Sequence, residues 1–155
     1  MNPLLKTPVR ELMTHPAVSV GDDSTIKEVF AVLKKHDIVG VPVVNAHQKV
    51  VGIVTESDLI KHFTTLGTPR AIDVLGSLVY LESLTEFNQH LKEHCSEWVR
   101  DLMTPQVVVV QANAPLQTAI DLMEANGVNR LPVVDEQHRL VGMLTRSNLL
   151  KHLTL

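Results

Sequence analysis

A block of sequence that recurs at a fixed spacing of 90 residues restricts the possible folds of this chain more than any other feature. VRELMT at 9–14 returns as VRDLMT at 99–104, PVV at 42–44 returns at 132–134, and VGIVT at 51–55 returns as VGMLT at 141–145. These matches need no gap between the copies. Two units that arose independently would share residue classes at corresponding positions, not identical residues at a constant spacing. The pattern therefore indicates duplication of one structural unit.

Each copy contains the same order of strand and helix signals. Short β-branched runs predict strands at 18–20 and 107–110, 41–44 and 131–134, and 50–54 and 140–144. A helix is predicted after the first strand of each copy, from a capping-box pattern at Thr25 and Glu28 and from Pro115 at the first helical position. Apolar residues at helical spacing then form one face in each copy: Ile26, Val29, Phe30 and Leu33, and Leu116, Ala119, Ile120 and Met123. A final helix begins near Glu56 and near Arg146.

The predicted unit is therefore β-α-β-β-α, and the fold class is α+β. One unit alone has a small sheet with too little to cover it. Two units that pair through their sheets about a pseudo-two-fold axis bury both faces, so we expect one repeat over 1–62 and the second over 99–155.

The segment 63–98 between the copies does not repeat, and we expect it to be largely helical. Ser83 and Glu86 form a capping-box pattern, and Leu84, Phe87 and Leu91 form one apolar edge. Leu75, Leu78, Val79 and Tyr80 add an apolar patch before that helix. Two interpretations stay open, a packed bridge between the copies and a surface for a partner.

Composition narrows the function classes. The formal net charge of −3 argues against a nucleic-acid surface. No apolar run approaches the ~20 residues of a membrane span, and 1–14 lacks the apolar stretch of a signal peptide. The single cysteine, Cys95, cannot form an internal disulfide. We expect a soluble protein of a reducing cytoplasm, without membrane insertion or nucleic-acid partner.

The repeated motif resembles the CBS domain, first seen in cystathionine beta-synthase, and a tandem pair resembles a Bateman module. The resemblance rests on Leu-Met-Thr, then apolar-Pro-Val-Val, then Val-Gly-apolar-apolar-Thr-x-Ser-Asp/Asn in both copies. It implies a stand-alone, bacterial-type regulatory protein that binds AMP, ADP or ATP, with S-adenosylmethionine less favoured, in clefts between the repeats. It also implies an effector protein that acts in trans, and often a disk-like homodimer.

In this family the Thr-x-x-Asp motif grips the ribose, and Thr55 and Asp58 match it. A carboxylate can accept hydrogen bonds from two hydroxyl groups, and such charge-assisted hydrogen bonds are stronger than neutral ones. The same motif is also a helix N-cap signature. In the second copy Thr145 is present but Asn148 replaces the acid, so that cleft is expected to hold ribose less firmly.

Arg130 stands where similar proteins carry a phosphate-contacting arginine, and its repeat mate is Gly40. The alternative for Arg130 is a plain surface charge. The resemblance also assigns the walls around adenine to the opposite repeat. For the cleft of Thr55 and Asp58 these are Met103, Val108, Val128 and Asn129, and for the cleft of Thr145, Asn148 and Arg130 they are Met13, Val18, Ile38 and Val39. The alternative for the apolar members is core packing.

No catalytic constellation stands out, so the chain is not expected to be an enzyme. His90 and His94 have a spacing that can bind metal, but a solvated helix face explains them better. Cys95 has no evident His-Asp arrangement. We therefore expect no metal and no cofactor beyond a regulatory adenine nucleotide. The competing hypothesis is a ligand-independent scaffold that dimerises and docks a partner through 63–98.

Overall fold

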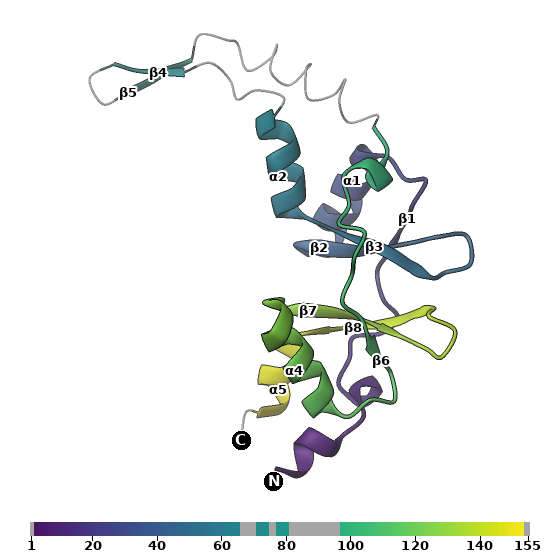
Figure 1. Cartoon of the computed structure of the whole chain (residues 1–155). Coiled ribbons are helices and arrows are strands. Elements are labelled where there is room, and N and C mark those ends of the chain that lie inside the picture. Colours follow the sequence, from purple (N-terminus) through teal and green to yellow (C-terminus); the bar gives the residue numbers. More distant parts are fainter. Residues whose placement is uncertain (1, 66–70, 75–76, 81–96, 154–155) are drawn as a thin grey trace.

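The computed structural model describes residues 2–65, 71–74, 77–80 and 97–153, and it contains two three-stranded sheets and one two-stranded sheet. Figure 1 shows the two repeats stacked along the long axis of the molecule, the first in blue above and the second in green and yellow below. None of the helices in the described ranges has the length and apolar character that a membrane crossing requires.

The first repeat has the predicted order of elements. These are β1 (Val20–Gly21), α1 (Ile26–His36), β2 (Gly40–Val44), β3 (Val50–Thr55) and α2 (Glu56–Thr65). The strand β1 runs parallel to β2, and β2 runs antiparallel to β3. The predicted strands at 41–44 and 50–54 are confirmed to within one residue, and α2 begins at the predicted residue.

The second repeat copies this order with β6 (Val110–Gln111), α4 (Leu116–Asn126), β7 (Arg130–Val134), β8 (Leu140–Thr145) and α5 (Arg146–Leu153). Both first strands are shorter and later than predicted, because only two residues of each pair with the central strand. Val107 and Val109 instead pack in a cluster between the two sheets.

Local capping explains where the first helices begin and end. The hydroxyl of Thr25 accepts from the backbone N–H of Glu28 at 3.3 Å, and the Glu28 carboxylate accepts from the Thr25 N–H at 2.8 Å. Pro115 occupies the N-cap of α4, with ψ 150°, rather than the predicted first helical position. Asp37 and Gly127 end the two helices in the left-handed conformation, which glycine adopts without strain.

The repeated block VR-x-LMT packs against the other copy, which the sequence analysis did not anticipate. Short 3-10 helices form at Val9–Glu11 (η2) and Val99–Asp101 (η3), and another, η1, at Pro3–Lys6. Val9 and Leu12 are buried in the core of the second repeat, and Val99 is buried in the core of the first. The packed units therefore exchange these segments, although the copies are contiguous in sequence.

The contacts between the units occur in pairs that obey a two-fold operation. Thr14 bridges Met143 and Thr104 bridges Ile53. The N–H of Leu140 donates to the Gln48 carbonyl at 3.0 Å. Its symmetry mate, the N–H of Val50, donates to the His138 carbonyl at 3.4 Å. Each contact maps onto its partner when 90 is added to one residue number and subtracted from the other, so the predicted pseudo-two-fold axis is confirmed.

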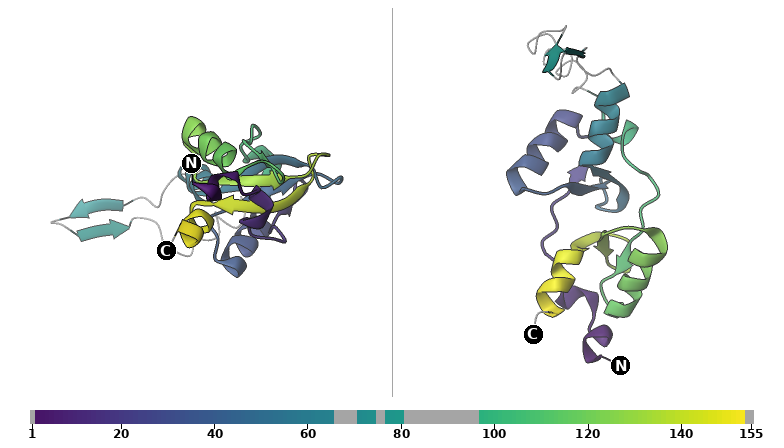
Figure 2. Two further views of the ribbon diagram at one scale, coloured as in Figure 1. Left: turned by 90° about the horizontal axis from the view of Figure 1, so that it is seen from below. Right: turned by 90° about the vertical axis from the view of Figure 1, so that its left-hand side faces the viewer.

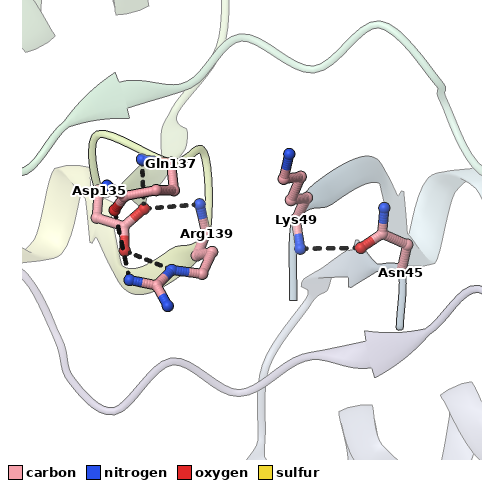
Figure 3. A network of polar contacts seen from close by, with 5 residues as sticks. All are labelled: Asn45, Lys49, Asp135, Gln137 and Arg139. Carbon is pink, nitrogen blue, oxygen red and sulfur yellow. Dashed lines mark hydrogen bonds and ion pairs between the residues drawn. The ribbon is translucent and has the colours of Figure 1, made fainter. Parts of the chain in front are cut away.

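The tips of the two long hairpins lie side by side, joined by a bridge between Lys49 and Arg139 (Figure 3). At one tip the side-chain oxygen of Asn45 accepts from the Lys49 N–H at 3.1 Å. At the other, Asp135 accepts from the N–H groups of Gln137 and Arg139 and from the Arg139 guanidinium, each at 2.9 Å. These hydrogen bonds, foremost that from the Arg139 backbone, lower the pKa of Asp135.

Between the repeats the structure describes an antiparallel hairpin of β4 (Ala71–Val74) and β5 (Ser77–Tyr80). We predicted only an apolar patch there, because four-residue strands offer too little alternation to separate them from an apolar loop. The predicted helix of Ser83 and Glu86 and the residues His90, His94 and Cys95 lie outside the described residues.

Candidate nucleotide-binding clefts

The Thr55–Asp58 motif forms a reciprocal cap at the start of α2. One carboxylate oxygen of Asp58, Oδ2, accepts from the Thr55 N–H at 2.9 Å and from the Thr55 hydroxyl at 3.0 Å, while the Asp58 N–H donates to that hydroxyl at 3.3 Å. The N-cap interpretation is therefore confirmed. The second oxygen, Oδ1, accepts no hydrogen bond from any residue that the structure describes, so the carboxylate keeps acceptor capacity for a ligand.

The Thr145–Asn148 motif repeats this geometry without the charge. Oδ1 of Asn148 accepts from the Thr145 N–H and hydroxyl, both at 2.9 Å. Its amide nitrogen, Nδ2, donates to the hydroxyl of Thr14 at 3.1 Å. A carboxylate has no N–H to donate, so an aspartate at this position could not make the bond to Thr14. Asn148 therefore connects the second motif to the exchanged segment 9–14 by a hydrogen bond.

Two methionines lie against glycines of the strands that lead to these motifs. A methyl group on Gly52 would clash with Sδ of Met103, and one on Gly142 would clash with Sδ of Met13. Met103 therefore sits on β3, which ends at Thr55, and Met13 sits on β8, which ends at Thr145. These are the groupings that the sequence analysis assigned, and contact of either side chain with adenine stays a prediction.

The remaining wall residues mostly pack within their own repeat. Val18 and Ile38 are partly buried against the first core, and Val108 and Val128 against the second. Val39 is 46% exposed. The amide oxygen of Asn129 accepts from Nη1 of Arg146 at 3.3 Å. Core packing therefore accounts for part of the apolar surface of every apolar wall residue except Val39, and the assigned roles in a cleft remain predictions.

Arg130 reaches from the second repeat to the first. Its backbone pairs with Thr145, whereas a methyl group on Gly40 would lie 2.6 Å from its Nη1 and 3.1 Å from Cγ2 of Thr55. The guanidinium thus lies against Gly40, which pairs with Thr55, and extends toward the cleft of Thr55 and Asp58, whereas the sequence analysis assigned Arg130 to the cleft of Thr145 and Asn148. Burial lowers the pKa of Arg130 below its ordinary value, while the carboxylate of Glu56 acts in the opposite direction.

Sequence reasoning did not detect the role of Thr14 or the space that Gly40 provides for Arg130. The repeated Leu-Met-Thr was the signal that could have indicated the role of Thr14, since core packing alone does not require a threonine at the same position in both copies. Within the described ranges, no group of three or more His, Cys, Asp or Glu side chains is arranged to hold a metal ion.

The arrangement agrees with the comparison to known proteins. The family model described as CBS domain matches residues 9–65 and 99–155. The chain belongs to the CBS-domain family. As a CBS pair it is 34% identical over 152 residues to uncharacterized protein MJ1426 of Methanocaldococcus jannaschii, covering 94% of this chain and 90% of that protein.

Two solved structures extend the likeness of the CBS pair. The CBS domain of a CBS domain containing membrane protein from Sphaerobacter thermophilus has a TM-score of 0.74 at 26% identity, covering 98% of this chain and 91% of that one. CBSX2, solved in complex with AMP, has a TM-score of 0.68 at 25% identity, covering 94% of each chain.

Proposed function

We propose that this CBS pair is a regulatory module that binds adenine nucleotides between its repeats and, depending on whether nucleotide is bound, regulates a separate effector protein. One observation carries the proposal: the guanidinium of Arg130 lies against Gly40, the strand partner of Thr55, and Asp58 at the adjoining helix start keeps one carboxylate oxygen without a hydrogen bond from any described residue. A nucleotide monophosphate needs those two groups together, a carboxylate for the ribose hydroxyls and a cation for the phosphate.

The two clefts differ in strength under this proposal. At Asp58 the ribose meets a charged acceptor, and charged-group hydrogen bonds contribute ~1.5–3 kcal/mol against ~0.5–1.5 for neutral ones. At Asn148 the amide is neutral and already donates to Thr14. We therefore assign the tighter site to Thr55 and Asp58, with AMP, ADP or ATP preferred over S-adenosylmethionine, whose sulfonium centre gives Arg130 no phosphate to bind.

The relatives support the ligand class. CBSX2 was solved with AMP, and its likeness to this chain covers both repeats. The proposal adds a cytoplasmic location, where adenine nucleotides are made and used, and self-association as a homodimer.

The competing function is a docking scaffold that works without a ligand. The hairpin β4–β5 favours it, because the hairpin lies away from both sheets in every view (Figures 1 and 2). Thermal melting separates the two functions, since a ligand of the folded state raises the melting temperature by mass action. A scaffold without a nucleotide site gives the same melting temperature with and without AMP.

The sharpest test of the nucleotide site compares AMP with adenosine. We expect Arg130→Ala to weaken AMP binding much more than adenosine binding, and the loss to shrink as salt screens the native contact. Arg139→Ala is the matched control, because it removes the same side chain at a hairpin tip, where Arg139 pairs with Asp135. Equal losses for both ligands would mean that Arg130 shapes the cleft, and no loss for either would make it a surface charge.

A further inference from the structure

The start of α2 places a second carboxylate beside the arginine of the proposed nucleotide site. Glu56 directly follows Thr55, and its backbone N–H donates to the Val39 carbonyl at 2.8 Å. The next residue along the chain, Gly40, begins β2 and lies against the guanidinium of Arg130. Glu56 and the guanidinium therefore meet the same short stretch of backbone at the start of β2.

Neither of these two charges is neutralised by a direct contact. The guanidinium of Arg130 and the carboxylate of Glu56 form no hydrogen bond or ion pair with any residue that the structure describes. Burial lowers the pKa of Arg130 and Glu56 acts in the opposite direction, so the two groups lie close enough to influence each other. The N–H groups of the guanidinium are thus open to a phosphate, beside a negative charge that stays uncompensated.

The local backbone does not explain why the residue after Thr55 is acidic. Arg146 occupies the equivalent position in the second repeat, and its N–H donates to the Asn129 carbonyl at 3.1 Å in the same way. An acid in the first turn favours a helix through its dipole, yet α5 begins at the equivalent residue with a base. The side chain of Glu56 is also exposed, so core packing does not require it.

The charges around the proposed site suit one phosphate better than several. The carboxylates of Asp58 and Glu56 stand against one guanidinium, that of Arg130, so the site is negative before any nucleotide binds. Lys34 and Asp37 line the same groove as Glu56, and their opposite charges offset each other. The first phosphate meets the guanidinium, whereas each further phosphate adds negative charge within reach of Glu56, because charges interact over roughly 8 Å at physiological ionic strength.

We propose that Glu56 selects against polyphosphates, so that the cleft of Thr55 and Asp58 takes a nucleoside monophosphate in preference to the diphosphate or triphosphate. Repulsion between the Glu56 carboxylate and the added phosphates supplies the discrimination, and an uncompensated charge set against a competitor is a general source of specificity. The inference rests on the proposed nucleotide site and adds which member of the ligand class that site accepts.

Calorimetric titration with AMP, ADP and ATP in the absence of divalent cations tests this role at the site that Asp58→Ala removes. In the wild type we expect AMP to bind more tightly than ATP. In Glu56→Gln the ratio of the ATP Kd to the AMP Kd is expected to fall roughly fivefold, as for the loss of one partly screened charge. The difference between the two proteins should shrink as salt rises. Glu124→Gln is the matched control, because it removes an exposed helix carboxylate of the second repeat and should leave the ratio unchanged.

Charge reversal gives a second readout that a purely structural role would not move. Glu56→Arg is expected to fold, since Arg146 begins the equivalent helix, and to bind ATP more tightly than AMP. Glu56→Asp is expected to keep the wild-type order. Equal or tighter binding of ATP by the wild type would overturn the proposal, and so would a lowered melting temperature with an unchanged ratio in Glu56→Gln and Glu56→Arg. Failure of every nucleotide to bind the wild type would refute the nucleotide site itself, which distinguishes that failure from a loss of selectivity alone.

Discussion

Gly40→Ala is the substitution that most sharply isolates the contact between the repeats at the proposed nucleotide site. The new methyl group would lie 2.6 Å from Nη1 of Arg130 and 3.1 Å from Cγ2 of Thr55. Real methyl groups do not approach another atom to 2.6 Å, so Arg130 or the backbone must move, whereas the 3.1 Å contact with Thr55 is only tight. The guanidinium is the far end of a flexible side chain and moves most easily, whereas Thr55 is held by its bonds to Asp58.

The magnitude follows from which group gives way. If Arg130 swings aside, AMP loses a hydrogen bond to a charged group, which is worth ~1.5–3 kcal/mol or about a 10- to 150-fold rise in Kd. Stability changes much less, because the displaced side chain is half-buried rather than part of the core. Adenosine, which lacks the phosphate, is expected to lose little affinity.

Calorimetric titration with a double-mutant cycle tests this reasoning. In an Arg130→Ala background the guanidinium is already absent, so Gly40→Ala is expected to add little further loss of AMP affinity. Gly127→Ala is the control, because a methyl group there meets no atom within 4 Å but the residue has φ +62°, which costs stability alone. Fully additive losses, or equal losses for AMP and adenosine, would refute the displacement of Arg130.

Two further predictions use residues whose repeat mates already show the alternative chemistry. Asp58→Asn is expected to keep the helix cap, as Asn148 does, and to weaken ribose binding in calorimetry. Asp58→Ala is expected to lose the cap as well, which costs ~1 kcal/mol of stability or about 2–4 °C in melting temperature. A sharp fall in melting temperature with unchanged nucleotide binding would mean that Asp58 only caps the helix. The pKa of Asp135 is lowered on folding, so its ionised form stabilises the protein above the unfolded pKa of ~3.9, and that stability is lost as pH falls through the folded pKa. Asp135→Asn should therefore lower the melting temperature at neutral pH but not at acid pH, with Asn45→Asp as the matched control, and a pH-independent difference would contradict the role of the charge.

Local features of this fold were readable from the sequence because they depend on neighbours along the chain. The capping box of Thr25 and Glu28, the strand pairs around PVV and the starts of α2 and α5 each follow from a few adjacent residues. The reciprocal cap of Thr55 and Asp58 is of the same kind. Its signature predicts the geometry but does not separate capping from ribose binding, since the same atoms can serve both.

Features that depend on how the repeats meet were not readable. Val9 and Val99 occupy each other's expected cores, yet an exchanged segment and one that packs on its own copy have the same apolar pattern. The approach of Arg130 to Gly40 likewise depends on the distance between β2 and β7. A glycine and an arginine at matching positions gave a hint of asymmetry, but only the packed structure shows that one provides the space for the other.

Calorimetric titration of the wild-type protein with AMP, ADP, ATP, S-adenosylmethionine and adenosine is the decisive test of nucleotide binding between the repeats. We expect saturable binding of the phosphorylated ligands, tighter for AMP than for adenosine, with a rise in melting temperature that grows with ligand concentration. The tighter site should disappear in Asp58→Ala. Absence of heat and of any shift in melting temperature with all five ligands at millimolar concentration would contradict nucleotide binding and leave the scaffold function.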